Sequence, residues 1–370
     1  MKPTTQITIL ILISAFVAAL LMYAHNMHNR PASQTGNSRQ TQQRWINDFY
    51  TEQTTLPPAP QIPLNLATLG NIEISQPYIH KNMTLFIISK PQDNKPATNY
   101  ITLDEGITQG KVKILEKENA EVERLEIENN SDLPLFLQSG DIVKGGQQDR
   151  TIQISITIPP HSSKIDIPSL CVEQSRWTEW AGGAKFESTC QNAPSKGMRM
   201  AAQKGDQSFQ WASVGILKSQ VSTNMGLARS TTSSVNEELE NPRVKETIAE
   251  YEKALTPLLR KHPNAVGMAF ALNGEINTIE IFQSPKLFQK VSSKLLKSWS
   301  LESIANQPKK EAKAVGIDEV KIFIAEMEKG KGTENAYNDN KVIRLENEKG
   351  LASDLMDKDK KIIHRQYIKK

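Results

Sequence analysis

The residues of this chain best suited to chemistry lie in two segments, residues 140–150 and residues 171–177. The first contains three glycines within apolar, strand-forming sequence, and the second combines a thiol, a carboxylate, a guanidinium and an indole. Glycine lets the backbone approach a ligand closely, while charged and amide side chains supply donors and acceptors. The candidate ligand-binding residues are Gly140, Asp141, Lys144, Gly145, Gly146, Gln147, Gln148, Asp149, Arg150, Glu173, Arg176 and Trp177.

Two interpretations of the glycine segment remain open. In the first, it is a structural β-turn in which Gly145 and Gly146 supply positive φ and Asp149 forms a local ion pair with Arg150. In the second, Arg150 and Lys144 bind a phosphate or carboxylate, and the glycine amides form an anion-binding nest. Together with nearby carboxylates that could orient hydroxyls, this inventory suits a nucleotide-derived or other phosphorylated small molecule.

The second segment also permits two interpretations. Trp177 or Trp180 could stack on a base or on the apolar face of a ligand, next to Glu173. Alternatively, Arg176 pairs with Glu173, and the two segments form one structural network that holds the strands in register.

The same segments hold the candidate catalytic residues, Asp141, Asp149, Cys171 and Glu173. Two of the carboxylates could serve as acid and base in a hydrolase or transferase acting on a nucleotide-derived or glycosidic substrate, or Cys171 could be a nucleophile. A buried thiol is usually inert, and in an exported protein Cys171 could instead pair with Cys190. Because the catalytic constellation is incomplete, we expect a ligand-binding or sensor module, with an enzyme as the alternative and a structural role still open.

Composition argues against several partners. The six histidines and two cysteines lack metal-site spacing, so no metal or other cofactor is expected. The net charge of +4 arises entirely in the last thirty residues, which hold nine basic and five acidic side chains. The remainder therefore has no basic footprint for nucleic acid. The basic end is interpreted as solvated, with contact to a membrane surface as the alternative.

A combination of short motifs resembles the signature of the ARG and rhodanese-phosphatase-superfamily-associated protein domain, an uncharacterised bacterial domain in whose name ARG means ADP-ribosylglycohydrolase. The resemblance runs from about Leu64 to the C-terminus. It implies no established activity, but it implies association with enzymes that handle ADP-ribose or phosphate. The resembling residues are Phe136-Leu137, Gly140-Asp141, residues 145–150, Pro159-Pro160 and residues 171–177.

The elements that must position these residues are strands. Alternating apolar residues separated by turn signals predict a mostly antiparallel β-rich region over residues 64–180, built as a β-sandwich or an incomplete barrel. The glycine segment is then a connection between two strands. Predicted strands lie at residues 72–74, 85–88, 100–103, 112–115, 122–128, 133–137, 151–158 and 164–167.

The second half has a different pattern. Residues 182–205 show little periodicity and are expected to form a long surface loop, and a helix-hairpin-helix unit is expected over residues 207–300. Terminal strands over residues 320–370 complete an α+β fold whose strands join across the two halves. The specific predictions are helices at 209–226, 235–261 and 285–299, a hairpin turn at 273–275, and strands at 341–345 and 362–367.

The N-terminal end predicts a membrane anchor over residues 1–25. Ile7 to Ala24 is uncharged, and as a helix it would span roughly 27 Å, close to the thickness of a bilayer core. A cleavable signal peptide is the alternative, although Met22 suits a cleavage site poorly. We expect a single-pass protein with its globular body, residues 64–370, outside the cytoplasm beyond a flexible, proline-rich tether at residues 26–63. Arginines after the span leave the orientation open.

Overall fold

The structure is a computed structural model that describes residues 72–90, 97–117, 123–174, 186–228, 232–308, 314–337 and 339–370. The chain divides into two compact units at Pro58, and the described residues all belong to the second unit. The predicted anchor and tether lie outside the described residues, as do Arg176, Trp177 and Trp180. Among the helices that are described, none is long and apolar enough to cross a membrane.

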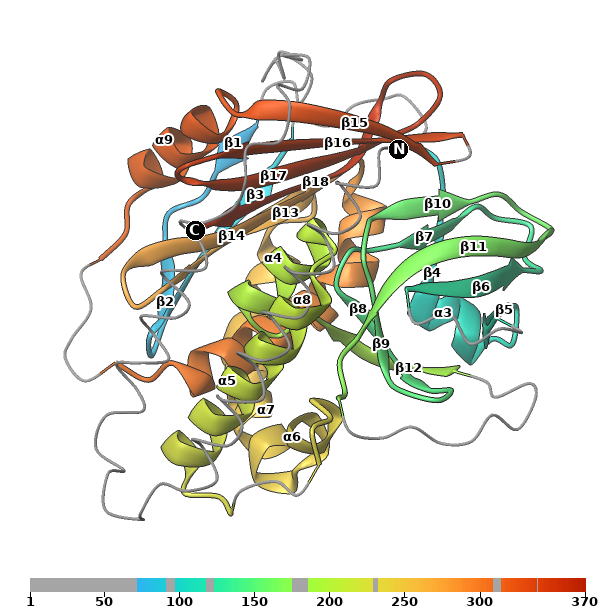
Figure 1. Cartoon of the computed structure of the whole chain (residues 1–370). Coiled ribbons are helices and arrows are strands. Elements are labelled where there is room, and N and C mark those ends of the chain that lie inside the picture. Colours follow the sequence, from blue (N-terminus) through green and yellow to red (C-terminus); the bar gives the residue numbers. More distant parts are fainter. Residues whose placement is uncertain are drawn as a thin grey trace, which may run out of the picture. The chain divides into compact units, whose positions relative to one another are not determined.

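A nine-stranded antiparallel sheet forms one part of the described fold (Figure 1). It joins early strands to the central hairpin and to four C-terminal strands, which confirms the prediction that strands join across the two halves. Its order is β1-β3-β13-β14-β18-β17-β16-β15, with β2 paired to β3. The strands are β1 (Glu73–Ile74), β2 (Tyr78–His80), β3 (Met83–Ser89), β13 (Ala265–Leu272), β14 (Glu275–Phe282), β15 (Lys331–Tyr337), β16 (Asn340–Asn347), β17 (Gly350–Met356) and β18 (Ile362–Lys369).

A six-stranded sheet curves into a half-barrel, which confirms the incomplete barrel among the predicted architectures (Figure 1). Its order is β12-β8-β9-β11-β6-β5, and a smaller sheet has the order β10-β7-β4. The half-barrel strands are β5 (Val112–Glu116), β6 (Arg124–Asn129), β8 (Asp141–Gly145), β9 (Arg150–Ile152), β11 (Ser162–Cys171) and β12 (Phe186–Asn192), and the smaller sheet contains β4 (Ile101–Thr102), β7 (Leu135–Leu137) and β10 (Ile156–Ile158). The glycine segment connects β8 to β9, as predicted.

Helices pack on both faces of the nine-stranded sheet. Successive side chains of a strand point to opposite faces, so Leu85 and Ile87 of β3 pack in the core that contains α8, whereas Phe86 and Ile88 pack in the core that contains α9. The helices α5 and α7 pack in turn against α8. The described helices are α3 (Leu103–Thr108), α4 (Lys196–Lys204), α5 (Gln207–Met225), α6 (Asn236–Glu240), α7 (Pro242–Lys261), α8 (Pro285–Ala305) and α9 (Ile317–Met327).

Two predictions of the second half need correction. The stretch expected as a surface loop contains β12 and α4, and α4 ends at Gly205 in the left-handed conformation that glycine favours. The single helix expected over residues 235–261 is two helices. Asn241 caps the second through its side chain, and Pro242 begins it because proline lacks an N–H that could continue the preceding turn.

Candidate functional site

The turn between β8 and β9 requires glycine. Gly145 and Gly146 have φ values of 132° and 57°, which confirms the predicted positive φ at both positions. A Cβ atom on Gly146 would also lie 2.3 Å from the Phe186 ring and 2.5 Å from Glu116 Oε1. The absence of a side chain therefore lets β12 and β5 approach this turn.

The amides of this turn hold carboxylates that the protein itself supplies. The N–H of Gly145 donates to Asp149 Oδ1 at 3.0 Å, and the N–H of Gln147 donates to Glu116 Oε1 at 3.1 Å. The segment thus has the anion-binding character predicted from its glycines, and Glu116 and Asp149 occupy these amides.

Arg150 projects from the start of β9 and is completely buried. Its Nη2 lies 3.3 Å from Glu116 Oε1, and its Nη1 donates to the carbonyl of Gln148 at 2.9 Å. Because the Arg150 and Glu116 side chains are both shielded from water, their ion pair is sensitive to the loss of either partner. This pair connects the turn to β5.

Cys171 lies at the end of β11 and its thiol donates to Gln148 Oε1 at 3.1 Å. Burial raises the pKa of Cys171 to about 11, and the neighbouring Arg150 charge only partly opposes this rise. The group is therefore a neutral thiol near pH 7, which disfavours nucleophilic attack by Cys171. Cys171 and Cys190 are both free thiols in the structure.

Asp149 fastens the half-barrel to the segment that precedes α6. Its Oδ2 accepts hydrogen bonds from Ser234 Oγ at 2.9 Å and from Asn236 Nδ2 at 2.7 Å. Lys144, at the end of β8, forms an ion pair with Glu240 at the other end of α6. Two residues of the predicted site therefore position α6 and its preceding segment.

That preceding segment forms one wall of a pocket of about 200 Å³. The opposite wall is α5, and the end of the second predicted segment completes the lining, where the N–H of Gln174 donates to Ser233 Oγ at 2.8 Å. The indole Nε1 of Trp211 is buried and has no hydrogen-bond partner among the described residues. The lining residues are Gln174, Trp211, Val214, Gly215, Lys218, Thr232 and Ser233.

Lys218 carries the positive charge of the pocket lining. Its Nζ donates to Glu238 Oε2 and to the Ser234 carbonyl, both at 2.7 Å. Burial raises the pKa of Glu238, although the Lys218 ammonium opposes this shift. The positive charge is thus balanced inside the protein, and the pocket offers hydroxyl, amide and indole groups beside it.

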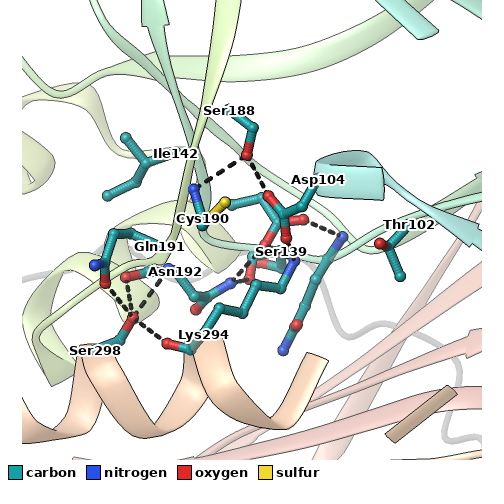
Figure 2. A network of polar contacts seen from close by, with 12 residues as sticks. Thr102, Asp104, Ser139, Ile142, Ser188, Cys190, Gln191, Asn192, Lys294 and Ser298 are labelled. Atoms are coloured by element: carbon teal, nitrogen blue, oxygen red, sulfur yellow. Dashed lines mark hydrogen bonds and ion pairs between the residues drawn. The ribbon is translucent and has the colours of Figure 1, made fainter. Parts of the chain in front are cut away.

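Asp141 belongs to a different buried network, shown in Figure 2. Its Oδ1 accepts from Lys294 Nζ at 2.7 Å and from Asn192 Nδ2 at 3.2 Å, and its Oδ2 accepts from the Gln138 N–H at 3.0 Å. Lys294 on α8 also lies 3.4 Å from Asp104 on α3. Burial raises the pKa of Asp141 despite Lys294, and the two aspartates together raise the pKa of Lys294 against the effect of its own burial. This network joins the half-barrel to α3 and α8.

The outer side of this network is an irregular part of β12. Ser188 donates to Asp104, and the register of β12 against β8 shifts between Ser188 and Asn192 (Figure 2). Cys190 lies within this bulge, is exposed, and has a φ of 52°. Bulges re-aim side chains, and here the bulge allows Asn192 to reach Asp141.

A further polar chain was absent from the sequence predictions. His364 on β18 lies 2.8 Å through Nδ1 from Ser155 Oγ and 2.5 Å through Nε2 from Glu280 Oε2 on β14. The order of hydroxyl, imidazole and carboxylate is that of a hydrolytic triad, but all three residues are buried. They come from distant parts of the sequence, so no spacing could have indicated their meeting.

These contacts define an α+β protein in which a half-barrel is fastened by buried ion pairs to a helix-covered antiparallel sheet. The sequence profile of the ARG and Rhodanese-Phosphatase-superfamily-associated Protein domain matches residues 71–368, so the chain belongs to this family and the resemblance seen in its motifs is confirmed. No curated protein and no solved structure matches the chain.

Proposed function

We propose that this protein is a ligand-binding or sensor module that takes part of a nucleotide-derived or other phosphorylated small molecule in the pocket beside α5. The observation that carries the proposal is the pocket itself, which adjoins the second predicted segment and contains the unpartnered indole N–H of Trp211. A buried donor without a partner has a free-energy cost that a ligand acceptor would remove. In the same proposal, Ile7 to Ala24 anchors the chain to a membrane with the body outside the cytoplasm.

The size and charge of the pocket favour a particular part of such a ligand. A volume of about 200 Å³ is below the roughly 300–1,000 Å³ typical of sites for whole drug-sized ligands. Lys218 is already balanced by Glu238, so the attraction for a doubly charged phosphate is reduced. Hydroxyl and amide groups from Thr232, Ser233 and Gln174 suit a ribose or another sugar ring, with any phosphate directed outside the pocket.

The positions of the predicted carboxylates support binding over catalysis. Asp149 is engaged by Ser234 and Asn236, whereas Asp141 is engaged by Lys294 in the network with α8. A pair of acid and base groups must act on one substrate from one cleft, and these two carboxylates serve separate networks. Their contacts favour a supporting role around the pocket.

A thermal-shift screen of the full chain tests this function with ribose, ribose 5-phosphate, ADP-ribose, NAD and inorganic phosphate. A ligand present at about 100 times its dissociation constant should stabilise the fold by about 2.7 kcal/mol. Trp211→Phe removes the indole N–H but keeps an aromatic ring, so we expect it to weaken the shift. Trp299→Phe is the matched control, because its indole Nε1 is also buried and unpartnered but lies outside the pocket lining. Equal shifts in both variants, or none in the parent, would contradict the proposal.

A hydrolase is the second candidate, favoured by the chain of Ser155, His364 and Glu280. Ser155 would be the nucleophile, His364 the base and Glu280 the group that orients it. Ser155 is only 6% exposed, so a substrate must displace the surrounding residues to reach it. Labelling of Ser155 by a fluorophosphonate, abolished in Ser155→Ala and slowed in Glu280→Gln, would support this candidate. An unlabelled Ser155 in the folded protein would exclude it.

A further inference from the structure

A second hollow, of about 300 Å³, lies between α9 and the hairpin that joins β13 to β14. Its floor contains Ile276, Val315 and Phe323, which are nearly buried, and its edge carries Ile322 of α9. Ile322 is 62% exposed, although it is a large apolar side chain. The full lining is Gly274, Glu275, Ile276, Val315, Glu319, Ile322, Phe323, Glu326, Lys349 and Lys369. We call this set the α9 groove.

The α9 groove has the composition of a contact surface. An apolar floor with a charged rim is the usual anatomy of a protein interface, in which a buried apolar anchor is surrounded by polar groups. The groove offers a cavity for such an anchor, and Ile322 beside it is a side chain that would gain free energy by leaving water. The pocket proposed for the small ligand is lined by other residues and does not use this surface.

We propose that the α9 groove binds a second copy of this chain through a two-fold symmetric contact. In such a contact the same patch serves both copies, so it must carry both the protruding group and the cavity that receives it. The α9 groove carries both, since Ile322 lies on the edge of its own apolar floor. Ile322 of each copy inserts into the groove of the other.

The charges around the groove are also self-complementary. Glu319 and Glu326 lie on α9, whereas Lys349 and Lys369 come from the β16–β17 turn and from β18. A two-fold axis through the groove brings the acidic helix of one copy toward the basic side of the other. The contact of Lys369 with Glu275 within one copy, at 3.7 Å, involves exposed side chains and is weak enough to be exchanged.

The patch is small, so the association should be weak. Stable dimers generally bury about 1,600 Å² in total, and a contact built on one groove and one isoleucine per copy falls at the low end of the range. We therefore expect a dissociation constant of roughly 10 μM to 1 mM.

Analytical ultracentrifugation of the full chain over a range of concentrations tests this inference. The parent should show a reversible monomer-dimer equilibrium, and Ile322→Glu should raise the dissociation constant by about tenfold or more. Ile79→Glu is the matched control, because Ile79 on the edge strand β2 is also 62% exposed but lies outside the groove. Both variants keep the N-terminal segment, so any association through that segment cancels in the comparison.

The outcomes separate clearly. Loss of association in Ile322→Glu with normal association in Ile79→Glu supports the two-fold contact. A parent that stays monomeric at about 1 mM overturns it, as does equal weakening by both substitutions. Unchanged thermal unfolding of Ile322→Glu under conditions where the protein is monomeric will show that a loss of association is not a loss of folding.

Discussion

Replacing Lys294 with methionine removes the ammonium that neutralises buried Asp141. The lysine lies 2.7 Å from Asp141 and 3.4 Å from Asp104, and both Lys294 and Asp141 are almost completely buried. Removing one partner of a buried ion pair costs about 3–5 kcal/mol, because the other charge stays unpaired away from water. Against a typical stability of about 5–15 kcal/mol, we expect Lys294→Met to lower the free energy of unfolding by roughly a third or more.

The loss should depend on pH in a defined direction. The pKa of Asp141 is raised in the folded protein, so its stabilising contribution is complete below the unfolded pKa and is lost as pH rises through the folded pKa. Lys294 opposes that rise, and its removal should raise the pKa of Asp141 further. The parent and Lys294→Met should therefore differ more at pH 8 than at pH 5, where the variant can keep Asp141 protonated.

Urea unfolding followed by circular dichroism at both pH values measures these differences. The double variant Lys294→Met/Asp141→Asn removes the unpaired charge as well, and it should recover most of the stability with little dependence on pH. The reasoning is refuted if Lys294→Met costs less than about 1 kcal/mol at pH 8, if its cost does not change with pH, or if Asp141→Asn fails to restore stability.

Two further predictions concern the turn between β8 and β9. Glu116→Gln leaves the buried guanidinium of Arg150 without a carboxylate, so urea unfolding should show a loss of about 3–5 kcal/mol; a loss below about 1 kcal/mol would show that this pair contributes little. Iodoacetamide at pH 8 should modify exposed Cys190 but not Cys171, whose pKa is raised to about 11 by burial, and mass spectrometry of the native protein will detect the difference; equal rates at the two cysteines would contradict this environment.

Local features of the turn could be predicted from the sequence, whereas its partners could not. The positive φ of Gly145 and Gly146 follows from local backbone sterics, which adjacent residues determine. The groups that meet the turn, Glu116, Ser234 and Asn236, are brought there only by the packing of β5 and α6. A single sequence contains the charges but does not specify their pairing.

The missed helix α4 has a related physical cause. It contains Arg199, a side chain whose type predicts exposure, yet Arg199 is buried between α4, β14 and α8. Its guanidinium donates to Glu302 Oε2 at 2.5 Å and to Asn277 Oδ1 at 2.7 Å. Because tertiary partners satisfy this charge, the buried face of α4 is not apolar, and the usual helical pattern of hydrophobic residues is obscured.

Asp149 connects the stability of the half-barrel with the pocket proposed for a ligand. One carboxylate oxygen accepts from the Gly145 amide in the turn, and the other accepts from Ser234, next to Ser233 in the pocket lining. A ligand that orders the segment around Ser233 should therefore favour the same arrangement that closes the turn. Coupling between two sites is reciprocal, so a substitution that loosens the turn must weaken the ligand by the same free energy by which the ligand tightens the turn. The conserved geometry of a binding surface need not lie in the surface itself: here the glycine segment acts on the pocket from behind, through one carboxylate.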